Sequence, residues 1–250
     1  MEAIVLCGGF AKRLEPLGEF VPKALLTLNG RPLVDYIVSN LGKIEDVNRI
    51  IISTNQKFED QFNYWIELKR NSGFKKKLEL VVEPTQDNDS KLGAVKGMAY
   101  AKRKAKVNED LLVILGDNFY TFNLRHILKG MQRHKEPSIV AYDIGSKEGA
   151  SRFGVVKVDS KGIVEEFEEK PEKPKSSLVS TGIYFYPSAS LGMLDEYVRS
   201  AGKADDIGHF IGWLSKKTQV RAIVPKSGEW FDIGTLDGYR QIFYSRMNGK

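Results

Sequence analysis

Short, continuous runs of Ile, Val and Leu, separated by helix-like patterns, are the feature of this sequence that most restricts its fold. The runs are AIVLC at 3–7, RIIIST at 49–54, LELVVE at 78–83 and LLVIL at 111–115. Because they are continuous rather than alternating, they predict strands buried on both faces of a sheet. Apolar residues recur at helical spacing between the runs, for example at Leu33, Ile37, Leu41 and Ile44. Such repetition predicts an α/β chain with a Rossmann-like open, mainly parallel sheet and helices on both faces.

The pattern changes after about residue 150. FGVVKVDSKGIVEEFEEKP at 153–171 alternates on either side of DSKG and predicts an antiparallel hairpin. Further strands are expected at 178–187 and 219–225, and helices at 188–199, 206–217 and 235–247. No linker separates the two halves, so we expect a single domain over 1–250, in which a mixed antiparallel region (151–250) lies over the parallel core (1–150). No run of hexapeptide repeats is found at the C-terminus, so no hexapeptide-repeat domain is expected there.

Composition excludes several classes of protein. No apolar run is long enough for a signal peptide or a membrane span, so no membrane partner is expected. A single cysteine, Cys7, cannot form an internal disulfide, which fits a reducing cytoplasm. The net charge is +6, but the cations are interleaved with 32 acids, and the run KKK at 75–77 is typical of a solvated loop. We therefore expect no nucleic-acid partner, although the positive balance suits small anionic substrates.

A loop rich in glycine and cations follows the first predicted strand, in LCGGFAKRLEPLGEFVPKALL at 6–26. Its adjacent glycines match neither the Walker A spacing nor the dinucleotide-binding Gly-x-Gly-x-x-Gly spacing. Ligands of open α/β sheets bind at the carboxyl ends of the strands. Gly8 and Gly9 follow the first strand, and GDN at 116–118 follows the fourth. Both stretches are therefore predicted to line one cleft.

Two acids are candidates for a metal site. Asp117 follows a buried strand and a glycine, where it could hold a hard cation together with phosphate oxygens, or could equally be a turn or helix-capping residue. Asp232, in EWFDIGTLDGY, is the candidate second carboxylate, although alone it too could be a cap or turn residue. The three histidines, His126, His134 and His209, show no metal-ligand spacing and are assigned to structural or surface roles.

Cations and one thiol complete the set of candidates. Arg13 and Lys23 flank the prolines of the first loop, where they could stabilise a transferring phosphoryl group or could simply face solvent. Lys170, between Glu169 and a proline, has the same two interpretations. Cys7 ends a buried strand, so a packed thiol is favoured over a nucleophile.

The ordered set of motifs resembles the sugar-1-phosphate nucleotidylyltransferases, a family that includes the glucose-1-phosphate thymidylyltransferases. The resemblance covers nearly the whole chain. The motifs are GGFAKRLEPL with PKALL, then LGAV at 92–95, GDN at 116–118, FGVVKVD at 153–159, EKP at 169–171, STGIYFY at 180–186 and WFDIGT at 230–235.

The resemblance implies roles for the matching residues. Asp117 and Asp232 would hold Mg²⁺, and Arg13 and Lys23 would act on the triphosphate and the reacting phosphorus. The implied nucleotide-binding residues are Cys7, Gly8, Gly9, Glu83 and Gly93, and the implied residues for the sugar phosphate are Glu169, Lys170 and Gly182. On this interpretation residues 1–150 form the nucleotide-binding core, and residues 151–250 form the sugar-phosphate-binding and lid region.

The implied reaction is attack by a sugar 1-phosphate on the α-phosphorus of a nucleoside triphosphate, with release of pyrophosphate. The substrates favoured are dTTP or UTP and glucose 1-phosphate, and the family suggests a homo-oligomer. Two departures from the family pattern, Ala11 and Lys12, leave the rate and the nucleotide preference open. Glu83 stands where many relatives have Gln, so it could accept from thymine, uracil or guanine. The alternatives are a guanylyltransferase for mannose or heptose 1-phosphate and a non-catalytic protein that binds nucleotide sugars.

Overall fold

Four parallel strands form the core of the molecule. A computed structural model of the chain describes residues 1–10, 17–87, 89–200, 206–234, 238–240 and 242. The four strands lie in the order β5, β4, β1, β6, and all their pairings are parallel. Their bounds are β1 (Glu2–Leu6), β4 (Arg49–Asn55), β5 (Lys77–Glu83) and β6 (Leu111–Leu115). The four predicted strands are therefore confirmed, each to within one residue at either end.

Side chains of these strands are buried on both faces of the sheet. Ile4 and Ile51 are paired neighbours that pack in one apolar cluster, whereas Val5 and Ile52, one position on, pack in a second cluster. Successive side chains of a strand point to opposite faces, so a strand covered on both sides needs an apolar residue at every position. This burial explains why the runs are continuous rather than alternating.

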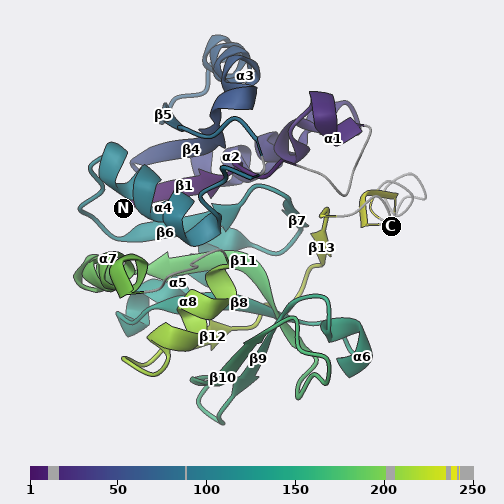
Figure 1. Ribbon diagram of the computed structural model, residues 1–250, viewed down its shortest axis with the longest axis vertical. Helices are drawn as coiled ribbons and strands as arrows, with labels where there is room; N and C mark the ends of the chain where they lie inside the picture. Colours follow the sequence, from purple (N-terminus) through teal and green to yellow (C-terminus); the bar gives the residue numbers. More distant parts are fainter. Residues whose placement is uncertain (11–16, 88, 201–205, 235–237, 241, 243–250) are drawn as a thin grey trace.

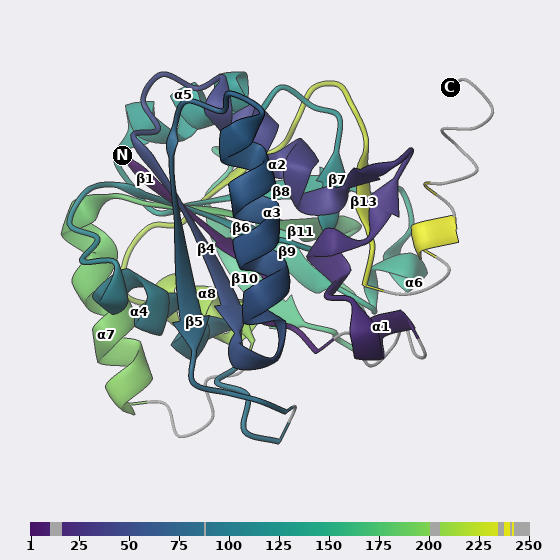
Figure 2. The same ribbon diagram turned by 90° about the horizontal axis from the view of Figure 1, so that it is seen from above.

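Helices cover both faces of the sheet, as predicted (Figures 1 and 2). Apolar residues of one set of helices join the cluster of Val5, and those of the other set join the cluster of Ile4. The first set is α2 (Leu33–Gly42), α3 (Glu59–Asn71) and α5 (Leu124–His134). The second set is α4 (Ala94–Lys104), α7 (Leu191–Ser200) and α8 (Ile207–Leu214).

The second half of the chain extends the same sheet with strands that run mostly antiparallel. Strand β11 (Leu178–Tyr186) lies antiparallel to β6 and joins the parallel core to the strands beyond it. On its other side it pairs with β8 (Ser138–Asp143) and, at one position, with β9 (Gly154–Val158). The predicted hairpin is confirmed as β9 with β10 (Val164–Glu169), which projects at the opposite end of the molecule from α3 (Figure 1). Strand β12 (Arg221–Ile223) runs parallel to β8.

A short antiparallel ribbon stands apart from the main sheet. It pairs β7 (Asn118–Tyr120) with β13 (Trp230–Asp232), which places Asp232 opposite Asn118. The hydrophobic pattern did not predict this ribbon, because each strand has only three residues. The remaining short elements are α1 (Leu17–Phe20), η2 (Lys23–Leu25), β2 (Thr27–Leu28), β3 (Arg31–Pro32), η3 (Gln56–Phe58), α6 (Lys147–Ala150) and η4 (Ser188–Ser190).

The predicted helix over 235–247 lies largely outside the described residues, although 238–240 and 242 are helical. Within the described part of the chain, no helix has the length and apolar character needed to cross a membrane.

Candidate active site

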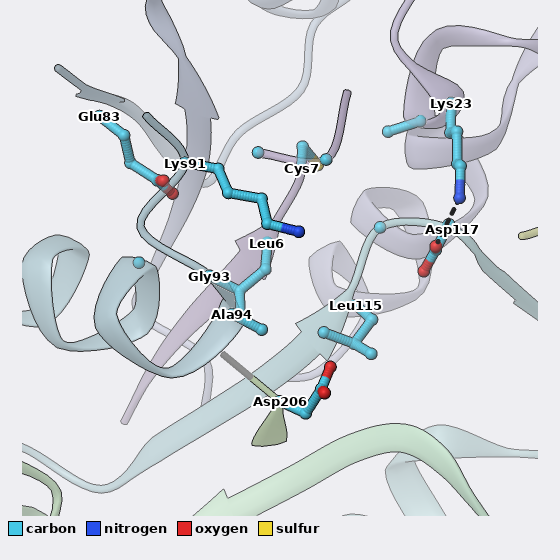
Figure 3. Close-up of a pocket in the computed structure, with 15 residues that line it drawn as sticks. Leu6, Cys7, Lys23, Glu83, Lys91, Gly93, Ala94, Leu115, Asp117 and Asp206 are labelled. Carbon is cyan, nitrogen blue, oxygen red and sulfur yellow. Dashed lines mark ion pairs between the residues drawn. The ribbon is translucent and has the colours of Figure 1, made fainter. Parts of the chain in front are cut away.

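Two adjoining cavities open where the parallel strands end. Each has a volume of about 270 Å³. The first is lined by the loop after β1 and by the turn after β6, so the two stretches predicted to share a cleft do meet (Figure 3). The cavities share five lining residues, namely Lys23, Ala94, Leu115, Asp117 and Asp206. They therefore form two ends of one continuous cleft.

Glu83 is the last residue of β5, and its carboxyl group lines the first cavity. It is buried, and its Oε1 accepts a hydrogen bond from Ser53 Oγ at 2.9 Å. The carboxyl group lies against Gly8 and Gly97, where an added Cβ would come within 3.0 and 2.8 Å of Oε1. Burial raises the pKa of this carboxyl group, and the hydrogen bond from Ser53 offsets only part of that effect.

Cys7 also lines the first cavity, but its thiol is not suited to nucleophilic attack. The residue is buried, and an added Cβ at Gly116 would lie 2.6 Å from its Sγ atom. Burial, together with the negative charges of Asp117 and Glu83, raises the pKa of the thiol far above its ordinary value. The thiolate is the nucleophilic form, so Cys7 acts as a packed thiol.

Helix α4 begins at the rim of the first cavity. Gly93 occupies its N-cap position with a φ of 79°, a left-handed conformation that favours glycine, and it supplies no side-chain cap. The first N–H groups of the helix therefore lack a side-chain partner from the cap and are available to a ligand. Lys91, two residues earlier, extends its side chain over the same cavity (Figure 3).

The second cavity lies over the antiparallel half of the sheet. Glu169 and Lys170, at the end of β10, line it and form an ion pair at 2.9 Å between Oε1 and Nζ. Gly182 of β11 also lines it, with a φ of 76°. A side chain at Gly182 would collide with Asn118, because an added Cβ would lie 2.7 Å from Nδ2. The glycine thus lets β11 approach the turn that carries Asp117.

Charged groups gather where the two cavities meet. Asp117 Oδ2 lies 3.5 Å from Lys23 Nζ, an ion pair whose side chains are 33% and 18% exposed (Figure 3). Asp232 comes from the far end of the chain and lines the second cavity beside them. The ribbon sets its position, because Ile233 N donates to Asp117 O at 2.9 Å. Gly234 N also donates to Asp232 Oδ1 at 3.0 Å.

Asn118 is a positioning residue that the sequence analysis did not single out. It is buried, and its Oδ1 accepts a hydrogen bond from Trp230 Nε1 at 2.9 Å. Its Nδ2 lies 3.4 Å from Asp117 Oδ1. The Asn118 amide group thus connects Asp117 to β13, the strand that carries Asp232.

The donor set at this junction fits Mg²⁺. Two carboxylates, Asp117 and Asp232, are hard oxygen donors, and Mg²⁺ typically binds one or two carboxylates and completes its shell with water and substrate phosphates. Among the described residues there is no cluster of three or more His, Cys, Asp or Glu side chains that could hold a metal alone. The protein could therefore supply part of a metal site that a phosphorylated ligand would complete.

The structure places every described residue of the predicted site in one of the two cavities. Cys7, Gly8, Gly9, Glu83 and Gly93 line the first. Glu169, Lys170, Gly182 and Asp232 line the second, while Lys23 and Asp117 line both. Arg13 lies outside the described residues, as do Ala11 and Lys12. Sequence reasoning missed Lys91 and Asp206, because a lysine in a charged loop and an acid before a helix are ordinary surface features.

Open α/β sheets bind their ligands at the carboxyl ends of the strands, which is where both cavities of this structure open. The Nucleotidyl transferase family matches residues 2–248 of this chain. The protein therefore belongs to the nucleotidyl transferase family.

Known relatives agree with this assignment. The chain is 29% identical over 94% of its length to a bifunctional sugar-1-phosphate nucleotidylyltransferase/acetyltransferase of Sulfurisphaera tokodaii. It is 28% identical over 96% of its length to a glucose-1-phosphate thymidylyltransferase of Neisseria meningitidis. A solved UDP-glucose pyrophosphorylase in complex with UDP-glucose shares the fold, with a TM-score of 0.83 over 100% of this chain and 99% of the other, at 18% identity.

The chain spans about half the length of several curated relatives, 52% in the Sulfurisphaera protein, and 81% of the Neisseria protein. Other relatives carry names that specify guanyl and adenylyl transfer.

Proposed function

We propose that this protein transfers a nucleotidyl group from dTTP or UTP to a sugar 1-phosphate, with glucose 1-phosphate as the favoured acceptor, and that it requires Mg²⁺. The observation that carries the proposal is the ion pair of Asp117 and Lys23 at the junction of the two cavities, with Asp232 lining the second cavity on the strand that pairs with Asn118. One cavity would bind the nucleotide and the other the sugar phosphate, so the reacting phosphates would lie at the junction.

The reaction needs positioning and charge neutralisation rather than a nucleophilic side chain. A phosphate oxygen of the sugar 1-phosphate would attack the α-phosphorus, and the bond from that phosphorus to the bridging oxygen would break to release pyrophosphate. The attacking oxygen is already anionic at neutral pH, so no general base is required. Both substrates are anions that repel each other, and Lys23 and Lys170 would reduce that repulsion while the cavities hold the two groups in line.

Asp117 and Asp232 would hold the Mg²⁺. The ion would supply positive charge to the phosphate oxygens. Arg13, by its resemblance to the family's loop arginine, would add a further cation at the triphosphate.

Glu83 and Lys91 favour a pyrimidine base. An ionised carboxylate only accepts hydrogen bonds, and an ammonium group only donates them. Thymine and uracil offer one N–H donor, which Glu83 would accept, and a carbonyl oxygen, to which Lys91 on the same cavity would donate. Guanine offers two adjacent donors, and Glu83 Oε1 is already engaged by Ser53. Adenine has a ring acceptor where a donor is needed.

The test is pyrophosphate release across a grid of substrates. The donors are dTTP, UTP, GTP, ATP and CTP, and the acceptors are the 1-phosphates of glucose, mannose, galactose and N-acetylglucosamine, each with and without Mg²⁺. We expect turnover with dTTP or UTP and glucose 1-phosphate, and only when Mg²⁺ is present. Turnover with GTP and mannose 1-phosphate would instead identify a guanylyltransferase.

A nucleotide-sugar sensor would give a different result. It would bind UDP-glucose or dTDP-glucose tightly and release no pyrophosphate with any pair, and that outcome would refute the proposed reaction. Asp60→Asn, on the exposed surface of α3, is the matched control for a substitution of a site carboxylate such as Asp117→Asn, because it also removes a carboxylate.

A further inference from the structure

Asp206 stands before α8 but does not cap it. Its backbone is extended, with φ −104° and ψ 137°, in the N-cap position, yet its carboxylate accepts no capping hydrogen bond. An Asp in this position usually accepts from an N–H group of the first turn. In α5, for comparison, the N-cap residue Asn123 accepts from His126 N at 3.1 Å. Among the described residues, none forms a hydrogen bond or an ion pair with the Asp206 carboxylate.

The side chain instead lies in the cleft. Asp206 is one of the five residues that line both cavities, and its carboxylate points toward Leu115 (Figure 3). It is only partly buried, so its oxygens can reach a ligand. A carboxylate in a ligand cleft without a protein partner is a hydrogen-bond acceptor for the ligand.

The first turn of α8 brings Asp206 and Glu169 to the same wall of the second cavity. The glutamate packs against Gly208, two residues after Asp206, where an added Cβ would lie only 2.1 Å from Glu169 Oε2. Lys170 pairs with Glu169 and balances its charge. The charge of Asp206 has no such balance among the described residues.

An unbalanced carboxylate repels phosphate, so this wall suits the neutral part of the substrate. The phosphates of the proposed reaction would lie at Lys23, Asp117 and Asp232. The part of a sugar 1-phosphate that remains is the ring, whose hydroxyl groups donate hydrogen bonds to carboxylates.

Resting on the function proposed above, we infer that Asp206 is a specificity-determining residue that accepts a hydrogen bond from a ring hydroxyl group of the hexose 1-phosphate. It would select sugars that place a hydroxyl group at this wall, and it would orient the ring so that the phosphate faces the junction. The ribose of the nucleotide is the competing source of hydroxyl groups, because Asp206 also lines the first cavity.

The test compares wild-type protein with Asp206→Ser and Asp206→Asn. Serine and asparagine favour the N-cap position about as much as aspartate does, and asparagine also keeps the shape of the side chain, so neither change should destabilise the start of α8. Steady-state kinetics are measured with dTTP and UTP, and with glucose 1-phosphate and its 2-, 3-, 4- and 6-deoxy analogues.

We expect Asp206→Ser to raise KM for glucose 1-phosphate about 10- to 100-fold, the size of a lost hydrogen bond to a charged group. KM for the nucleotide should stay unchanged. For the one deoxy analogue that lacks the contacted hydroxyl group, KM should be the same in wild type and in Asp206→Ser. Asp206→Asn should raise KM for glucose 1-phosphate less than Asp206→Ser does, since the amide oxygen of asparagine still accepts a hydrogen bond.

Three results would overturn the inference. The first is that Asp206→Ser raises KM by the same factor for glucose 1-phosphate and for every deoxy analogue. Another is a loss in KM for UTP but not for dTTP, which would place Asp206 at the ribose 2′-hydroxyl group. The third is a lower melting temperature with unchanged KM, as expected of a purely structural residue.

A wild-type protein without turnover would count against the proposed reaction and not against this contact. In that case calorimetric titration of UDP-glucose, and of its deoxyhexose analogues, into wild type and Asp206→Ser decides the matter. Equal affinities of the two proteins for UDP-glucose would refute the assignment.

Discussion

Asp117 combines partial exposure with a fixed position at the end of a buried strand. Its backbone oxygen accepts from Ile233 N, and its carboxylate pairs with Lys23. Changing it to Asn preserves the shape but removes the charge that would hold Mg²⁺. We expect Asp117→Asn to lower turnover by about 100-fold or more, the scale on which preorganised electrostatic groups act. Pyrophosphate release measures this effect, and activity near that of Asp60→Asn would contradict the metal role.

Glu83 links stability to pH through its burial. Its pKa is raised in the folded protein, while an unfolded glutamate titrates near 4.5. Between those two values the folded state binds more protons than the unfolded state, so the free energy of unfolding falls as pH rises through this window. Glutamine does not titrate there. We therefore expect Glu83→Gln to gain stability relative to wild type as pH rises above 4.5, until the carboxyl group of the folded wild type is ionised.

Urea denaturation at several pH values measures this difference. Glu67→Gln, on the exposed face of α3, serves as the control whose stability should follow that of wild type. Parallel curves for wild type and Glu83→Gln would show that burial does not perturb the Glu83 carboxyl group.

At the scale of elements, the ribbon of β7 and β13 connects the two acids. Its buried hydrogen bond from Trp230 to Asn118 joins residues 112 positions apart in the sequence. Asn118→Ala leaves the indole N–H without its acceptor, which should lower the free energy of unfolding by about 2 kcal/mol. Turnover should also fall, because Asp232 lies on β13, which would lose this hydrogen bond to β7.

A double-mutant cycle with Trp230→Phe separates the hydrogen bond from packing. Phenylalanine keeps an aromatic ring near Phe153, which contacts Trp230 edge-on at 5.2 Å between ring centroids. Once the N–H group is gone, Asn118→Ala should cost less, so the two losses should not add. Strict additivity would mean that the hydrogen bond does not stabilise the ribbon.

At the scale of the whole molecule, the cleft is built from both halves of one sheet. Glu83 and Gly93 come from the parallel core, whereas Glu169 and Gly182 come from the antiparallel half. A nucleotide sugar that occupies both cavities would bind only the folded chain. At about 100 times its Kd it should add about 2.7 kcal/mol of stability, or roughly 5–10 °C in Tm for a chain of this size.

Differential scanning fluorimetry with UDP-glucose or dTDP-glucose and Mg²⁺ measures this shift. Removal of Mg²⁺ with EDTA should reduce it, and Asp117→Asn should reduce it in the same way. A shift no larger than that produced by inorganic phosphate would argue against a ligand that spans both cavities.

Much of the fold could be read from local patterns. Continuous apolar runs predicted β1, β4, β5 and β6, because burial on both faces leaves a direct mark on consecutive residues. The hairpin of β9 and β10 was likewise predicted from alternation around a turn. The ribbon of β7 and β13 was not, because three-residue strands are too short to show a period.

Local patterns of apolar residues were sufficient to predict the parallel core and the helices on its two faces, since these depend on the periodicity of neighbouring residues. The folded structure was needed to show that Asp232 lies opposite Asn118, that Glu83 is buried between Gly8 and Gly97, and that Asp206 turns into the cleft instead of capping α8. These facts depend on contacts between segments far apart in the chain. Nothing in the local pattern around an acid tells whether its partner is the next turn of its own helix or a ligand in a cleft.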